Sequence, residues 1–154
     1  MTAADDVIRA LELMPHPEGG HFREAYRAPV YGAARSAVTS IYYLLKAGER
    51  SHWHRIDAVE LWHHYAGAPL RLAVSEDGRQ IEDYRLGPDI GSGERPLGIV
   101  PEGAWQSAES LGEWSLVGCT VAPAFELTGF ELAPPGWAPT PLQSNSRSTR
   151  KPNT

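Results

Sequence analysis

The sequence predicts an all-β fold, and three observations lead to this prediction. Glycine and proline are abundant, at 15 and 13 of 154 residues, which favours many short elements joined by turns. Short runs of apolar and β-branched residues recur along the chain with turn residues between them. Helical spacing of apolar residues is confined to the amino end. A chain of this length is expected to form one domain with its own core.

The elements follow in order. A short N-terminal helix is predicted, capped by Asp5 or Asp6 and ended by Pro15 and Pro17. Its apolar residues recur at helical spacing: Val7, Ile8, Leu11 and Met14. The segment 76–79 is a hairpin signal because its glycine accepts a positive φ. Strands are predicted over 21–27, 37–45, 51–55, 58–66, 70–75, 80–86, 97–100, 114–120 and 128–132. This density of strands favours a barrel or a sandwich.

The chain divides into one domain over 1–137 and a tail over 138–154. Proline, serine, threonine, asparagine and arginine dominate the tail, which is therefore predicted to be disordered. The net charge is −5, and three basic residues of the tail leave the body more acidic still. An acidic body repels a phosphate backbone, so we expect no nucleic-acid partner.

Cys119 is the single cysteine, which excludes an intrachain disulfide and fits a reducing compartment. No apolar run approaches the roughly 20 residues that a membrane span needs, and the first residues are polar and acidic. We therefore expect a cytoplasmic protein without a membrane partner.

Four of the six histidines fall within thirteen residues: His52, His54, His63 and His64. Side chains of a strand alternate between its two faces, so His52 and His54 are predicted to point the same way, about 7 Å apart. Such a pair is able to share a divalent cation or to hold an anionic group.

The neighbouring residues form a recognisable pattern. Gly48, His52, His54, Glu60 and Gly67 stand in the order of the first signature of the cupin superfamily, which the chain resembles. The second signature is matched by Pro101, Gly103 and Gln106, with glutamine where a histidine is expected.

Further segments resemble the small single-domain cupins of domain-of-unknown-function family 985. They are PHPEGGHFRE (15–24), SIYYLL (40–45), HWHR (52–55), ELWHHYAG (60–67), GEWSLVGCTVAP (112–123) and FELA (130–133). This resemblance implies a cupin jelly-roll β-barrel behind the short helix, a homodimer, and a fold similar to that of the dTDP-sugar 3,5-epimerases. It implies no particular reaction.

The cupin alignment implies that His52, His54, Glu60 and Gln106 converge inside the barrel. Two imidazoles, a carboxylate and an amide oxygen suit Fe, Mn, Ni or Zn as a divalent metal. An amide oxygen is a poorer ligand than imidazole, so two alternatives stay open, a loosely held metal and none. Without a metal, His54 oriented by Glu60 is suited to acid–base catalysis, and Tyr43 is the expected opposing acid.

Four more residues are predicted to bind the small-molecule substrate. Trp62 and His64 share a strand face with Glu60, and Arg23 and Arg71 are expected to grip an anionic group. The remaining candidates receive structural interpretations: His16 and His21 as turn and surface residues, His63 as a structural or interface residue, and Cys119 as an inert core thiol.

Three classes of function follow from these residues. The first is an enzyme that isomerises or epimerises a small polar, sugar- or nucleotide-like molecule, with or without a metal. The second is a metal-dependent oxygenase or hydrolase. The third is a cupin that binds a small molecule without turnover. We favour the first.

Overall fold

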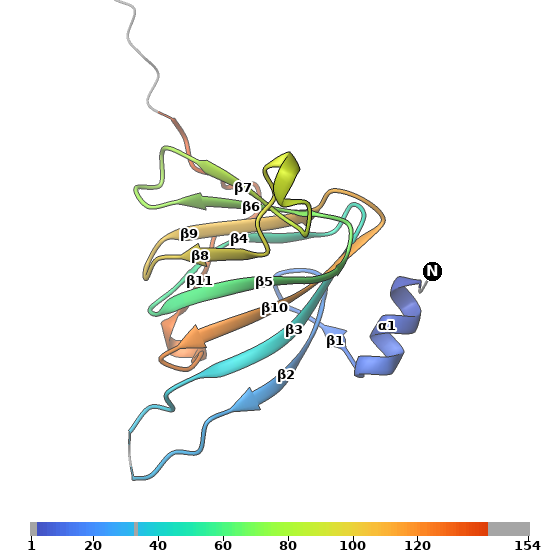
Figure 1. The fold of residues 1–154 in the computed structure, drawn as a ribbon. Helices are drawn as coiled ribbons and strands as arrows, with labels where there is room; N and C mark the ends of the chain where they lie inside the picture. Colours follow the sequence, from blue (N-terminus) through green and yellow to red (C-terminus); the bar gives the residue numbers. More distant parts are fainter. Residues whose placement is uncertain (1–2, 33, 142–154) are drawn as a thin grey trace, which may run out of the picture.

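The computed structural model describes residues 3–32 and 34–141, and it confirms the all-β class. Two antiparallel sheets face each other, and one helix lies outside them (Figure 1). The elements are α1 (Ala4–Leu11), β1 (Met14–Pro15), β2 (His21–Arg27), β3 (Thr39–Lys46), β4 (Arg50–Ile56), β5 (Val59–Gly67), β6 (Leu70–Ser75), β7 (Glu82–Leu86), η1 (Ile90–Ser92), β8 (Leu97–Val100), β9 (Trp105–Ser110), β10 (Trp114–Ala122), η2 (Leu127–Gly129) and β11 (Phe130–Leu132).

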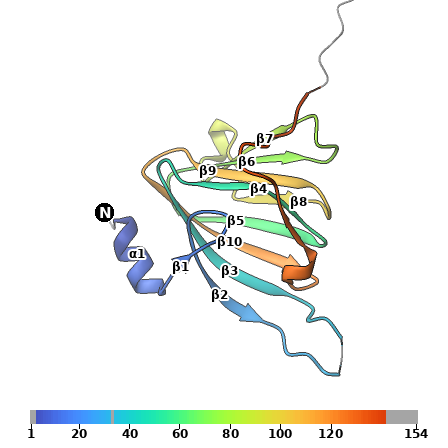
Figure 2. The same cartoon turned by 180° about the vertical axis from the view of Figure 1, so that it is seen from behind.

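The chain passes repeatedly between the two sheets. The six-stranded sheet has the order β1-β2-β3-β10-β5-β8, and the five-stranded sheet has the order β11-β4-β9-β6-β7. Consecutive strands such as β3, β4 and β5 therefore belong to alternate sheets (Figures 1 and 2). This topology brings side chains from distant parts of the sequence to one interior.

Strand β9 is the one long strand that the sequence did not predict. It lies between β4 and β6 in the middle of the five-stranded sheet. Its residues are mostly small or polar, and these types have low strand propensity. Its polar groups are bonded inside the fold, as in the 2.9 Å hydrogen bond from the Ser107 hydroxyl to the Ser51 carbonyl. Pairing with β4 and β6 therefore makes this segment a strand despite its low local propensity.

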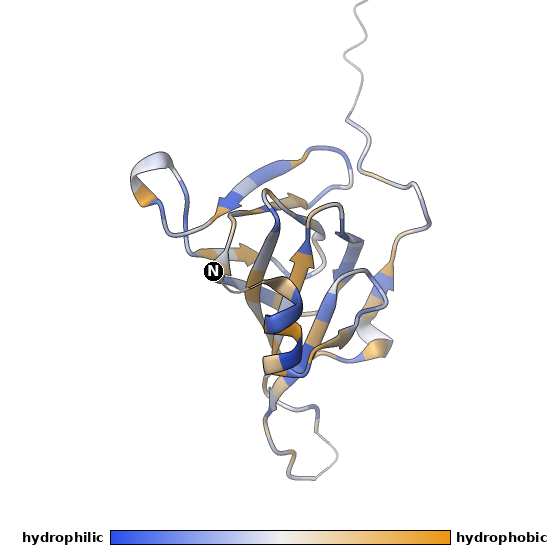
Figure 3. Ribbon diagram, turned by 90° about the vertical axis from the view of Figure 1, so that its right-hand side faces the viewer, coloured by the Kyte–Doolittle hydropathy of each residue, from blue (hydrophilic) through white to orange (hydrophobic). Residues whose placement is uncertain are grey.

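Helix α1 covers part of the outer surface of the six-stranded sheet. Its residues Val7, Ile8 and Leu11 pack against a buried cluster that includes Leu44 and Leu116. Figure 3 shows that the helix carries both strongly hydrophobic and strongly hydrophilic residues. Neither predicted aspartate caps the helix, because the N-cap is an alanine without a side-chain bond and both aspartates lie in the first turn.

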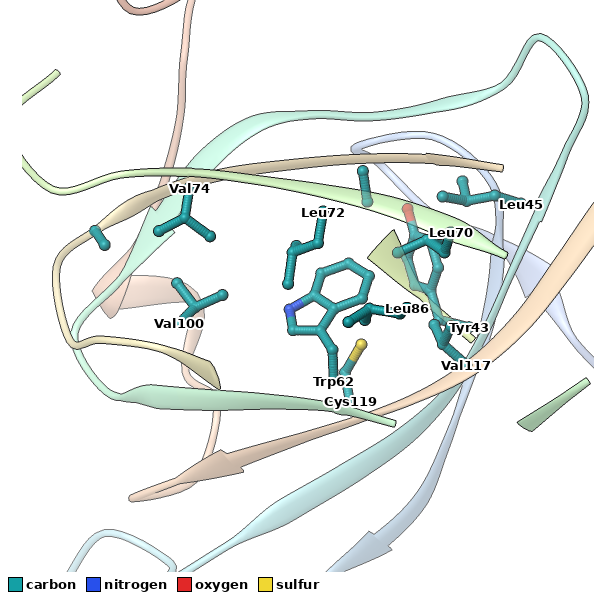
Figure 4. Close-up of a cluster of buried hydrophobic side chains, with 12 residues drawn as sticks. Tyr43, Leu45, Trp62, Leu70, Leu72, Val74, Leu86, Val100, Val117 and Cys119 are labelled. Atoms are coloured by element: carbon teal, nitrogen blue, oxygen red, sulfur yellow. The ribbon is translucent and has the colours of Figure 1, made fainter. Parts of the chain in front are cut away.

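One end of the barrel interior is filled by hydrocarbon side chains. Trp62 lies in the middle of this cluster, as Figure 4 shows, and its side chain is 1% exposed. The residues around it include Leu70, Leu72, Val74, Leu86, Val100 and Val117. The prediction that Trp62 contacts substrate is not supported by this position, because it belongs to the core.

The last described residues run over the outside of the five-stranded sheet. The Trp137 ring lies 4.5 Å from that of Trp105 and 6.3 Å from that of Trp53. Thr140 donates its backbone N–H to the Gly78 carbonyl, so residues 138–141 still contact the domain. The rest of the predicted tail, 142–154, lies outside the described residues. No helix in the described part of the chain has the length and apolar character needed to cross a membrane.

Candidate functional site

A cavity of about 780 Å³ occupies the end of the barrel that the core cluster leaves open. Its walls come from β2, β3, β4, β5 and β10, and from the segment around η2. The lining residues that bear on chemistry are His16, Glu18, Glu24, Arg27, Tyr43, His54, Glu60, Cys119 and Glu126. All three predicted catalytic residues, His54, Glu60 and Tyr43, are therefore brought to one cavity.

The predicted pairing of His52 with His54 is wrong, because a β-bulge separates them. Ser51 pairs with Ala108 of β9 and His54 with Gln106, so three steps along β4 oppose two along β9. A bulge breaks the period-two alternation, and Ser51 and His54 both point inward. The His52 imidazole instead lies outside the cavity, with Nε2 3.0 Å from the Pro134 carbonyl oxygen.

The hydrogen bonds of His54 define its tautomer. Its Nδ1 lies 2.8 Å from the His52 carbonyl oxygen, which only accepts, so Nδ1 carries the proton in the neutral ring. Nε2 then holds a lone pair, and it has no hydrogen-bond partner among the described residues. Burial lowers the pKa of His54, although the nearby Glu60 charge raises it in part. The ring is therefore a neutral base at neutral pH.

A buried chain of hydrogen bonds positions Glu60. The Trp62 indole N–H donates to the Gln106 amide oxygen over 2.8 Å, and the Gln106 amide nitrogen donates to Glu60 Oε1 over 2.9 Å. The indole is only a donor, so it fixes which end of the amide faces Glu60. Burial raises the pKa of the Glu60 carboxyl to about 7, against a partial lowering by His54. Glu60 is thus populated in both protonation states near neutral pH.

Glu18 is a buried acid at the cavity that the sequence did not single out. It accepts a 2.7 Å hydrogen bond from the Ser51 hydroxyl, and its Oε2 lies 3.3 Å from His54 Nδ1. Burial raises the pKa of Glu18. His16, predicted to lie at the surface, also lines the cavity. Both residues stand in the PHPEGG turn, whose proximity to β4 is a tertiary contact that residue spacing does not reveal.

Tyr43 and Cys119 complete the polar wall. The Tyr43 hydroxyl donates to the Gly19 carbonyl, and burial raises its pKa well above the ordinary value. A tyrosine with a raised pKa is a weaker proton donor, so its position does not strengthen the prediction of an opposing acid. Burial likewise raises the pKa of the Cys119 thiol, which agrees with its interpretation as an inert buried thiol.

The other predicted substrate-binding residues lie outside the cavity. Arg23 pairs with Glu12 on the exterior. Arg71 is engaged by two carboxylates of the five-stranded sheet, Asp83 at 2.8 Å and Glu109 at 3.2 Å. His64 lies where β5 bulges against β10, and its Nε2 is 2.9 Å from the Ala68 carbonyl oxygen. These three are therefore not lining residues.

The predicted metal ligands do not fit a metal ion in this fold. His52 points away from the cavity, and the amide oxygen of Gln106 is occupied by the Trp62 indole N–H. The amide instead presents its nitrogen, which is no metal ligand, toward Glu60. Within residues 3–32 and 34–141, no three His, Cys, Asp or Glu side chains are placed to share a metal ion.

Fold and site together define a β-barrel with an acid–base cluster at an interior cavity. The chain matches the family model described as "Cupin superfamily (DUF985)" over residues 5–133, and it belongs to this family. No match was found among curated proteins.

Several solved structures are similar to this chain. A protein from Shewanella oneidensis is 40% identical, with a TM-score of 0.82, over 86% of this chain and 85% of that one. A hypothetical protein from Leishmania major is 30% identical, with a TM-score of 0.79, over 86% and 88%. Oxalate decarboxylase from Bacillus subtilis is 17% identical, with a TM-score of 0.60, over 77% of this chain and 29% of that one. The last likeness concerns the fold alone and agrees with the cupin jelly roll.

Proposed function

We propose that this chain is a cupin enzyme that catalyses isomerase-type proton transfer on a small molecule bound in the cavity. One observation carries the proposal: the buried His54 and Glu60 line the same cavity in complementary roles. His54 has an imidazole Nε2 without a partner among the described residues, and Glu60 is a carboxyl group that still binds a proton near neutral pH. A base and an acid held together at neutral pH are what such chemistry requires.

The proposed step balances in protons and electrons. His54 Nε2 takes a proton from a carbon beside a carbonyl group, and the electron pair of that C–H bond forms the double bond of an enol. Protonated Glu60 gives its proton to the carbonyl oxygen. His54 is then an imidazolium and Glu60 a carboxylate. In a substrate whose α-carbon also carries a hydroxyl group, the enol is an enediol. His54 gives its proton to the former carbonyl carbon, the hydroxyl group on the α-carbon gives its proton to Glu60 as the new C=O bond forms, and both groups are restored.

The arrangement favours isomerisation over epimerisation. Epimerisation needs a second acid on the opposite face of the substrate, and Tyr43 was the residue expected to supply it. Its hydroxyl proton is engaged by the Gly19 carbonyl, so we assign Tyr43 to the cavity wall. The oxygenase or hydrolase alternative needs the four-residue metal set, and no observation favours it. The remaining alternative is binding without turnover.

Exchange of carbon-bound hydrogen tests the proposal. Phenylacetone and dihydroxyacetone are incubated with the protein in D₂O, and loss of their α-hydrogen signals is followed by NMR. We expect the protein to accelerate exchange of at least one of them, and we expect H54Q to reduce that acceleration by about 100-fold or more. Replacing His52, whose imidazole lies outside the cavity, in H52Q is the matched control, which should exchange like the parent.

Two results of the exchange experiment would contradict the proposal. If a ketone binds, as judged by chemical-shift changes of the protein, and exchanges no faster than in buffer, the chain binds without turnover. Exchange that survives in H54Q would instead remove His54 from the proposed role.

We also propose that the chain forms a homodimer through the outer face of β5 and β8. Leu61 pairs with Ile99 and His63 with Leu97 across this edge, so these four side chains share one face. Leu97 and Ile99 are exposed, and Tyr65 is stacked on His63 beside them. An exposed apolar patch of this kind favours an interface.

Light scattering during size-exclusion chromatography measures this assembly. The expected mass is twice the 16.9 kDa of one chain, and I99K is expected to give the single-chain mass. L111K, which places the same charge at an exposed residue in the turn between β9 and β10, should leave the dimer intact. A single-chain mass for the unmodified protein would contradict the proposal.

A further inference from the structure

We propose that the cavity selects an uncharged carbonyl compound with an apolar body and rejects compounds that carry phosphate or carboxylate groups. This inference rests on the proposed function, since it names the substrate class of the same site. It departs from the sugar- or nucleotide-like ligand expected from the sequence.

The walls of the cavity are mainly apolar. Eight hydrocarbon side chains line it: Pro17, Phe22, Ile41, Ile56, Val121, Phe125, Leu127 and Phe130. The Phe125 and Phe130 rings pack edge to face with centroids 5.7 Å apart, and the His54 ring lies 5.5 Å from Phe130. Burial of apolar surface contributes about 25 cal/mol per Å², so such walls favour a ligand with a hydrocarbon body. A sugar would leave most of its hydroxyl groups against hydrocarbon, which costs free energy.

The charges of the lining are unfavourable to anions. Four carboxyl groups face the cavity, from Glu18, Glu24, Glu60 and Glu126, and Arg27 is the one arginine or lysine among the described lining residues. Glu24 holds Arg27 through two hydrogen bonds of 2.8 and 3.1 Å. A guanidinium already paired in this way is a weak partner for a phosphate.

Arg27 also has a structural role at this place. Its guanidinium donates a 3.2 Å hydrogen bond to the Phe125 carbonyl, beside the apolar wall. The cations that the sequence suggested for an anionic ligand, Arg23 and Arg71, are paired outside the cavity. A phosphorylated ligand would therefore enter a site rich in carboxyl groups, where the one arginine among the described lining residues, Arg27, is already paired with Glu24.

A pair of matched ketones tests the inference. Phenylacetone and phenylpyruvate share a benzyl ketone body and differ by one carboxylate. Binding to the unmodified protein is measured by isothermal titration calorimetry at low salt, with UDP-glucose as the nucleotide-sugar probe. We expect phenylacetone to bind about 10-fold more tightly than phenylpyruvate, since tenfold corresponds to about 1.4 kcal/mol. UDP-glucose should show no saturable binding.

Variants of two lining carboxylates test whether charge causes the preference for phenylacetone over phenylpyruvate. In E24Q/E126Q two carboxylates are neutralised and Arg27 loses its charged partner, so the preference for phenylacetone should fall to about 3-fold or less. The control E76Q/E82Q makes the same change in net charge on the β6–β7 hairpin, away from the cavity, and should keep the parent preference.

Other results would overturn the inference. Equal or tighter binding of phenylpyruvate, saturable binding of UDP-glucose, or failure of phenylacetone to bind would each do so. These readouts concern binding, so they separate the inference from the proposed function. Selective binding of phenylacetone without hydrogen exchange removes the catalytic proposal alone. If the protein accelerates hydrogen exchange but binds phenylacetone and phenylpyruvate equally tightly, the proposed ligand class alone is removed.

Discussion

Replacing Glu60 with glutamine is expected to raise the free energy of unfolding by about 3 kcal/mol above pH 7 and to change it little below pH 4.5. The pKa of this carboxyl is raised to about 7 in the folded protein from an ordinary value of 4.5. Between these two values the unfolded chain releases the proton that the folded chain retains. Folding of the parent protein is therefore penalised progressively as the pH rises, and glutamine, which never ionises, avoids the penalty.

The difference between parent and E60Q isolates this residue from its titrating neighbours. His54 on β4, Glu18 in the loop before β2, and Cys119 on β10 all contribute to the electrostatics around Glu60. Urea denaturation of both proteins from pH 4.5 to 8 gives the difference at each pH. E113Q, at an exposed position, should show no such trend. A difference that is the same at pH 4.5 and pH 8 would show that the Glu60 pKa is not raised.

Replacing Gln106 with leucine is expected to destabilise the protein by about 2–4 kcal/mol. Gln106 is fully buried and links the Trp62 indole to the Glu60 carboxyl. Leucine has nearly the same size, so packing is largely kept. The loss comes from two buried polar groups that no longer have their partners.

A double-mutant cycle with W62F tests this explanation. Phenylalanine removes the indole N–H, so W62F should cost less in the Q106L background than in the parent protein, by about 1 kcal/mol. Urea denaturation of the four proteins measures the coupling. Additive losses would mean that the hydrogen bond between Trp62 and Gln106 contributes nothing to stability.

The fold was largely predictable because it depends on local patterns. Alternating apolar residues and glycine-containing turns indicate short strands, and most predicted strands lie within a few residues of the observed ones. The segment of β9 lacks this pattern, since Gln106, Ser107 and Ala108 have little strand propensity of their own. Its neighbours on both sides impose the strand.

The candidate site was only partly predictable. His54, Glu60 and Tyr43 were identified and line the cavity. The cupin signature marks the positions of His54 and Glu60, and Tyr43 was inferred as an acid that would oppose them. His52 was misplaced because the alternation rule assumes a regular strand, and β4 is bulged. Glu18 was missed because it lies 36 residues before His54 in the sequence and approaches it only in the folded chain.

By itself, then, the sequence determined the fold class, the family resemblance and the types of the acid–base residues, because each of these depends on short-range patterns. Only the tertiary structure decided which way the two histidines of HWHR point, which end of Gln106 faces Glu60, and that Glu18 joins them. Those outcomes depend on a one-residue bulge and on hydrogen bonds between strands distant in sequence, and neither leaves a periodic signal along the chain.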